Sequence, residues 1–152
     1  MTSIRRATPD DAVEVARLLH DFNTEYDDFT PGVEVLTRNA RDMIANGDMV
    51  VLLAGNGPDG LAELRFRKSV WTGKLDCYLE ELYVIPELRG QGIGRVLLRE
   101  AMDVARAEGA AHIELGTSED DEAARALYES EGFTNREGNP DGPVMFFYER
   151  EL

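Results

Sequence analysis

The stretch that decides the fold is residues 79–95, which read LEELYVIPELRGQGIGR. Its first half is rich in aromatic and β-branched residues and stops at Pro86, as a strand does where it ends. Its second half holds three glycines at positions 90, 92 and 94. Apolar residues then recur at helical spacing, at Val96, Leu97, Ala101, Val104 and Ala105. The stretch predicts a strand, a glycine-rich turn and a helix in succession.

This turn is predicted to bind phosphate. The first N–H groups of a helix lack partners within it, and the helix dipole adds positive potential at the same point. Glycine lets the backbone approach an anion closely, and Arg89 and Arg95 place cations beside the turn. The turn is not a Walker loop, since Gly94-Arg95 stands where Lys-Ser/Thr is needed, and its spacing does not fit a dinucleotide fingerprint. A tight loop whose glycines serve only geometry remains an alternative at this point.

Three motifs in register point to one family. Residues 89–94, RGQGIG, resemble the Arg/Gln-x-x-Gly-x-Gly/Ala signature of the GNAT superfamily of N-acetyltransferases, and residues 81–86 (ELYVIP) and 124–133 (ARALYESEGF) resemble further parts of it. The resemblance spans almost the whole chain and implies a single domain, residues 1–152, of the α/β (α+β) class. It implies a central mixed, mostly antiparallel sheet of about six to seven strands with about four helices, and a V-shaped splay between the fourth and fifth strands.

Composition sets the wider bounds. At 152 residues, with 43% apolar and 30% charged residues, the chain is typical of one globular domain. No apolar run reaches the length of a membrane span, no signal core begins the chain, and the cytoplasm is expected by default. The single Cys77 excludes an internal disulfide and is expected to be buried in a strand. His20 and His112 lack metal-ligand spacing, so no metal site is expected.

The net charge of −14 argues against a nucleic-acid partner, because phosphate contacts need clustered Lys and Arg. A coenzyme A anion is still accommodated locally, since Arg89, Arg95 and Arg99 gather at the glycine turn and its helix. The remaining acidity either attracts a cationic substrate or serves only solubility, and the sequence leaves both open.

The rest of the chain alternates between strands and helices. Strands are expected at residues 3–6, 48–54, 61–70, 75–85 and 112–117, with another beginning at Phe133 and a last one over 144–152 that closes the sheet. Helices are expected from the Thr8-Pro9 start to Phe22, over 33–45, from the glycine turn to Gly109, and over 122–131. The acidic, aromatic segment 23–32 links the first two helices.

The resemblance implies acetyl-CoA (coenzyme A) as the co-substrate, with the loop amides holding its pyrophosphate and the strand before the loop taking the pantetheine arm. The residues it assigns to the cofactor are Leu82, Tyr83, Val84, Arg89, Gly90, Gln91, Gly92, Ile93, Gly94, Arg95, Thr117, Ala124 and Leu127. The family often has Asn where this chain has Asp121, so the pantetheine contact could change there, or the acid could simply begin a helix.

The catalytic candidates are two carboxylates and a phenol. Glu80 and Glu81 can bind the amine or accept its proton, and alternation along a regular strand allows only one of them to face the cleft. The resemblance to the spermidine/spermine-acetylating branch favours Glu80. Tyr128 is matched to the family's proton donor for the departing thiolate, a role its pKa near 10 permits. Without the resemblance, Glu80 or Glu81 could also be a surface carboxylate of the strand, and Tyr128 a core aromatic residue of its helix.

The acceptor is expected to be a small cationic amine, such as a polyamine or an aminoglycoside-like compound, which attacks acetyl-CoA directly in a ternary complex. In the family, the region after the first helix covers the acceptor, which makes Glu25, Tyr26, Asp28 and Phe29 substrate-binding candidates. The alternatives are a protein or peptide acceptor, and a non-catalytic acyl-CoA sensor of the same fold. A homodimer is expected at the family level.

Overall fold

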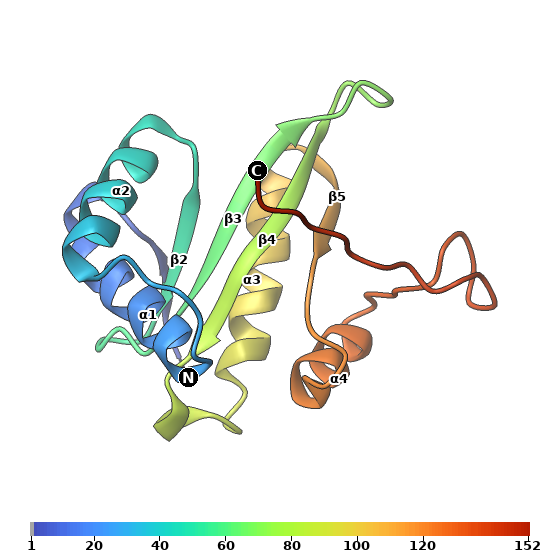
Figure 1. Cartoon of the computed structure of the whole chain (residues 1–152). Helices are drawn as coiled ribbons and strands as arrows, with labels where there is room; N and C mark the ends of the chain where they lie inside the picture. The colour runs from blue at the N-terminus through green and yellow to red at the C-terminus, as the bar shows by residue number, and fades with distance from the viewer. Residues whose placement is uncertain (1) are drawn as a thin grey trace. The chain divides into compact units, whose positions relative to one another are not determined.

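The computed structural model describes residues 2–152, which form two compact units, residues 2–115 and 116–152. The first unit holds five strands, three α-helices and two 3-10 turns (Figure 1). In chain order they are β1 (Ile4–Arg6), η1 (Pro9–Asp11), α1 (Ala12–Glu25), α2 (Val33–Asn46), β2 (Val50–Ala54), β3 (Gly60–Lys68), β4 (Leu75–Val84), η2 (Pro86–Leu88), α3 (Ile93–Ala107) and β5 (Ala110–Leu115).

The five strands form one sheet in the order β1-β2-β3-β4-β5. The first four pair antiparallel, whereas β4 and β5 pair in parallel, which confirms the expected mixed, mostly antiparallel sheet. The β4–β5 pairing runs from Leu75↔Ala110 to Leu79↔Leu115 and stops there, although β4 continues to Val84. Residues 80–84 of β4 therefore have no β5 partner, as the expected splay between the fourth and fifth strands requires.

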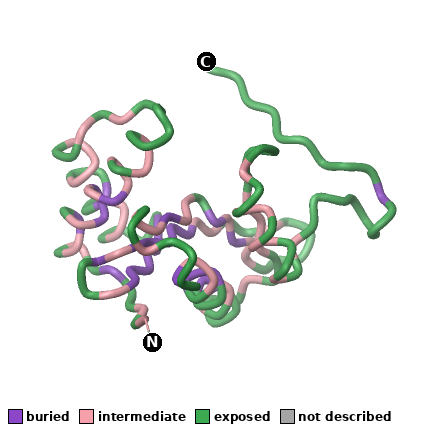
Figure 2. Tube along the Cα trace, turned by 90° about the horizontal axis from the view of Figure 1, so that it is seen from below, coloured by how far each residue is buried: buried purple, intermediate pink, exposed green. Residues whose placement is uncertain are grey.

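The sheet of the first unit is covered on both faces. Leu53, Leu61 and Tyr83 belong to the buried cluster that packs against α1 and α2. On the opposite face, a Cβ at Gly60 would lie 3.3 Å from Leu97 of α3. The buried positions of the first unit gather in the middle of the tube in Figure 2, and β2 and the first half of β3 are buried without a break. Successive strand residues serve opposite layers, which is why β2 reads as a continuous apolar run and is buried throughout.

Two element boundaries differ from expectation. Helix α1 continues to Glu25, so this residue belongs to the last turn of a helix rather than to the acidic link. Strand β5 begins at Ala110 and ends at Leu115, two residues before Thr117. Cys77 is fully buried as expected, and burial raises the pKa of its thiol to about 11.

The second unit contains one helix, α4 (Glu122–Ser130). The expected strands from Phe133 and over 144–152 were wrong for this structure: the only pairing within 116–152 is an isolated bridge between Arg136 and Val144. The physical reason is that residues 144–148 have high β-propensity, but a strand exists only where a second backbone supplies its hydrogen bonds. Across residues 2–152, no helix is long and apolar enough to span a bilayer.

Candidate active site

The glycine turn has the backbone that only glycine adopts easily. Gly90 and Gly92 have φ of +79° and +85°, in the left-handed region, and Gly92 is the N-cap of α3. A Cβ at either position would meet nothing within 4 Å, so backbone conformation rather than crowding demands glycine. The turn is exposed and leads straight into the N-terminus of α3, whose first amides are available to an anion. This geometry fits the phosphate of coenzyme A.

Arg89, at the start of the motif, is held in place by protein groups. Its guanidinium donates two hydrogen bonds of 2.7 Å to the Glu25 carboxylate, and its Nε donates to the Val84 carbonyl at 2.9 Å. It also lies 5.5 Å from the centroid of the Tyr83 ring. The bond from Arg89 lowers the pKa of Glu25. The structure therefore joins a predicted cofactor residue to a predicted acceptor residue, and ties the end of α1 to the entry of the glycine turn.

A β-bulge in β4 carries the two candidate carboxylates. Glu63 of β3 pairs with Glu81, whereas the next residue, Leu64, pairs with Leu79, so Glu80 is the extra residue. Glu80 follows Leu79 in normal alternation, and Glu81 shares the face of Glu63 through their pairing. Both carboxylates thus belong to the α1/α2 side of the sheet. The bulge suspends the alternation on which the expectation of a single cleft-facing carboxylate depended, and both carboxylates remain catalytic candidates.

Burial and like charge act together on these carboxyls. Glu63 is only 7% exposed. The pKa of Glu63 is raised to about 7, mainly by burial and then by the charges of Glu80 and Glu81. Arg65 has a smaller, opposing effect. The pKa of Glu81 is also raised to about 7, mainly by burial and then by the charges of Glu80 and Asp28. We call Asp28, Glu63, Glu80 and Glu81 the acid cluster. A carboxyl with a pKa near neutrality is suited to accept and release protons at physiological pH.

The segment after α1 lies over this region. The Asn23 side chain donates to the Phe29 carbonyl at 2.7 Å, and the Asp28 amide donates to the Asn23 carbonyl at 2.8 Å, which folds the segment back on the helix end. Phe29 is 82% exposed and Tyr26 52% exposed. Asp28 is near enough to raise the pKa of Glu81, so one of the predicted acceptor residues adjoins the predicted catalytic carboxylates.

Glu63 was not among the site residues that the sequence predicted. A signal was present: Glu63 stands between Leu61 and Leu64 in β3, in a strand whose other early residues are all buried. Its burial depends on the neighbouring strands β2 and β4, and local sequence does not reveal strand order.

The second unit holds Tyr128, Thr117, Ala124 and Leu127. Tyr128 is on α4, with its ring centroid 5.9 Å from that of Phe133. The carboxylate of Asp121 accepts a hydrogen bond of 3.1 Å from the Ala124 amide and caps the helix. Of the two roles left open for Asp121, the structure shows the helix start.

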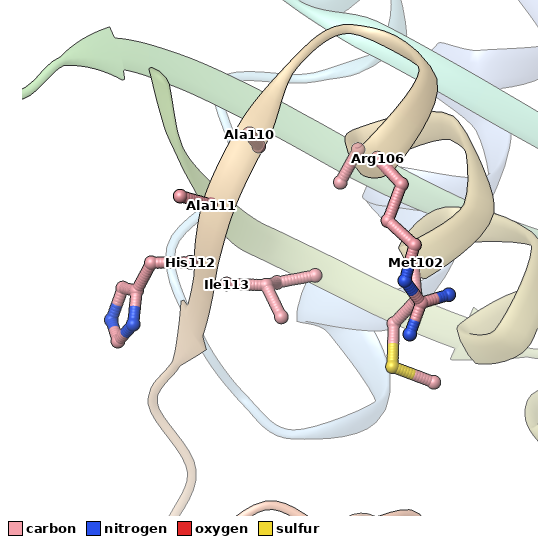
Figure 3. A pocket seen from close by; sticks show the side chains of 7 residues that line it. Met102, Arg106, Ala110, Ala111, His112 and Ile113 are labelled. Atoms are coloured by element: carbon pink, nitrogen blue, oxygen red, sulfur yellow. The ribbon is translucent and has the colours of Figure 1, made fainter. Parts of the chain in front are cut away.

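Metal ligands and a small pocket are the two remaining features of residues 2–152 that bear on a site. No group of three or more His, Cys, Asp or Glu residues in this range is arranged to hold a metal ion. A small pocket of about 150 Å³ lies between the end of α3 and β5, away from the acid cluster (Figure 3). Its lining is formed by Met102, Ala105, Arg106, Ala110, Ala111, His112 and Ile113.

Comparison with known proteins identifies the class. Residues 15–133 match the model of the acetyltransferase (GNAT) family, and the chain belongs to this family. It is an acyltransferase-type enzyme by this membership, and the family uses acetyl-CoA.

Individual relatives are similar over different lengths. The crystal structure of a proposed acetyltransferase from Arthrobacter sp. FB24 superposes with a TM-score of 0.91 at 45% identity, covering 99% of this chain and 96% of that one. An aminoglycoside N(6')-acetyltransferase type 1 from Stenotrophomonas maltophilia is 32% identical over 139 residues, 89% of this chain and 88% of that protein. A mycothiol acetyltransferase from Beutenbergia cavernae is 42% identical over 69 residues, which are 43% of this chain and 23% of that protein.

Proposed function

We propose that this protein transfers the acetyl group of acetyl-CoA to a primary amine of a small cationic acceptor, by direct attack in a ternary complex. The observation that carries the proposal is the acid cluster, which places four carboxyls beside the β4 bulge on the α1/α2 side of the sheet. A chain of net charge −14 adds long-range attraction for a cation. The likeness to an aminoglycoside acetyltransferase supports the same acceptor class.

The proposed chemistry assigns each step to a group of this chain. An acceptor ammonium binds at the acid cluster and loses one proton to Glu80 or Glu81, directly or through a water molecule. The neutral nitrogen attacks the thioester carbonyl and the C–N bond forms; the nitrogen then releases its second proton to solvent as the C–S bond breaks. Tyr128 gives its phenolic proton to the departing thiolate and regains one from solvent. The glycine turn holds the pyrophosphate, so much of the rate comes from positioning the two substrates.

Turnover with a panel of amines tests the proposal, with release of the free thiol of CoA as the signal. Diamines, polyamines and aminosugars should be acetylated, and their hydroxyl analogues should not. The apparent KM of the best amine should rise with salt, because ions screen charge over about 8–10 Å near physiological ionic strength. A neutral or anionic compound as the best acceptor, or a KM that is flat with salt, would contradict the acceptor class.

A pair of matched variants separates local from overall charge. Glu80→Gln should lower kcat/KM for the amine more than it weakens CoA binding. Glu100→Gln on α3 removes the same charge from an exposed helix position and should leave both constants near their original values. Equal effects of the two variants would show that only the overall charge matters.

We also propose that the chain works as a homodimer through its C-terminal segment. Five consecutive apolar or aromatic residues, 144–148, are between 37% and 87% exposed, and this segment is exposed along its length in Figure 2. An exposed apolar run of this kind is typical of a protein interface. Light scattering should report a dimer, and Phe146→Ser with Phe147→Ser should yield a monomer. A wild-type monomer at high concentration would contradict the proposal.

A further inference from the structure

Glu63 is a buried carboxyl without a partner. It is only 7% exposed, and within residues 2–152 its carboxyl takes part in no hydrogen bond and no ion pair, so its oxygens depend on the small solvent contact that remains to them. Asp11, by contrast, accepts two bonds of 2.8 Å from Arg5. A buried charge without a partner is costly, so the folded protein favours the neutral, protonated form of Glu63.

The register places this carboxyl against the acid cluster. Val51, Glu63 and Glu81 form one cross-strand row on the α1/α2 side of the sheet. Directly opposite strand residues have Cβ atoms about 4.5–5.5 Å apart, and two carboxylates at this spacing strongly oppose double ionisation. The row's third member, Val51, is apolar and offers no hydrogen bond.

The charged surroundings of the pair are mostly acidic. On β4, Glu80 acts on both carboxyls, and Asp28 from the α1–α2 connection acts on Glu81. Arg65 on β3 is the cation that acts on Glu63. Other ionisable groups nearby act on tyrosines of β4: Asp21, Glu25, Glu87 and Arg89 on Tyr83, and Glu114 on Tyr78.

We propose that Glu63 and Glu81 share a single proton in the free protein at neutral pH, and that binding of a cationic acceptor at this pair releases the proton to solvent. The inference rests on the proposed function, because it takes the acceptor to be an ammonium. Before binding, the pair carries one negative charge and one proton. After binding, both carboxylates are ionised and accept N–H donors of the ammonium, which replace the lost proton.

This exchange makes Glu63 a specificity-determining residue. When the pair loses its proton, it gains a second negative charge, and the positive charge of the bound ammonium compensates it. A hydroxyl analogue of the same size brings no charge, so the pair keeps its proton and gains little from contact. The pair therefore selects cations at a depth in the site where bulk salt screens weakly.

Carboxyl titration by NMR tests the first half of the proposal without any acceptor. With 13C-labelled glutamate, the two carboxyls of the free protein should titrate together in two steps, one below and one above neutral pH. In Glu63→Gln the midpoint of Glu81 should fall by about one pH unit, because a neighbouring negative charge is gone. Glu63→Leu should act the same way, and Glu100→Gln should leave both midpoints unchanged. Midpoints of both carboxyls near the ordinary value in the free protein would overturn the proposal.

The second half is tested with CoA bound, so that no turnover occurs, and 1,4-diaminobutane added at millimolar concentration as the cationic probe. Both midpoints should move to lower pH, and calorimetry in buffers of different ionisation enthalpy should report proton release that Glu63→Gln reduces. Addition of 1,4-butanediol should produce neither effect. Midpoints that the diamine leaves in place would overturn the release step, whatever the turnover assay finds. A shared proton and its release without turnover of any amine would instead overturn the proposed function.

Discussion

Glu63→Gln is expected to stabilise the protein at neutral and alkaline pH while leaving its stability unchanged in acid. The pKa of Glu63 is about 7 in the folded protein against an ordinary 4.5. The folded state therefore binds more protons than the unfolded state between these values, and the free energy of unfolding falls as pH rises through this window. A difference of about 2.5 pH units at about 1.36 kcal/mol each corresponds to about 3 kcal/mol. Glutamine keeps the shape of the side chain and removes its charge. The variant should therefore be about 3 kcal/mol more stable than the wild type above about pH 7.

Urea unfolding at several pH values from about 4.5 to about 8.5 measures the effect. The two proteins should have equal unfolding free energies at the acid end and diverge to about 3 kcal/mol at the alkaline end, with equal m-values. Glu100→Gln, an exposed charge removal on α3, should follow the wild type throughout. A difference in unfolding free energy between Glu63→Gln and the wild type that is constant across the pH range would refute the reasoning. It would show that ionisation of Glu63 does not destabilise the folded protein.

Three further predictions concern the glycine turn, the proton donor and the Arg89 brace. Gly92→Ala should raise the Kd for CoA about tenfold or more, because φ of +85° strains any side chain at the helix start, whereas Gly47→Ala at φ +82° should cost stability but leave the Kd unchanged. Tyr128→Phe should lower kcat by about 10²–10⁴-fold at saturating substrates with CoA binding preserved; unaltered turnover would make Tyr128 a packing residue. Glu25→Gln should raise both the amine KM and the CoA Kd, because the two 2.7 Å bonds from Arg89 join both regions, and strictly additive effects with Arg89→Lys would contradict the brace.

The local secondary structure of the chain could be predicted from its residues. The strand that ends at Pro86, the glycine turn and the helix that follows appear where residues 79–95 predict them. Gly47 ends α2 in the left-handed conformation, as the Asn46-Gly47 pair indicates. These features depend on backbone freedom and on apolar periodicity, which are properties of neighbouring residues and need no knowledge of the fold.

Strand pairing decided what the sequence left open. One residue inserted in β4 relative to β3 turns Glu80 and Glu81 to the same face and sets Glu81 against Glu63. Nothing in the run of residues 79–82 distinguishes a bulge from regular alternation, because a bulge is defined only by the partner strand. Residues 144–148 have high β-propensity but form no strand, because propensity alone does not supply a partner strand.

The sequence by itself determined the family, the glycine turn and the acidic character of the chain. Only the tertiary structure decided that Arg89 braces Glu25 and that Glu63 is a buried member of the acid cluster. The reason is physical: a side chain's charge is fixed by its identity, but its pKa and its partners depend on which distant residues fold against it. Residues 64 positions apart in the chain meet in the Arg89–Glu25 pair, and no local pattern records that contact.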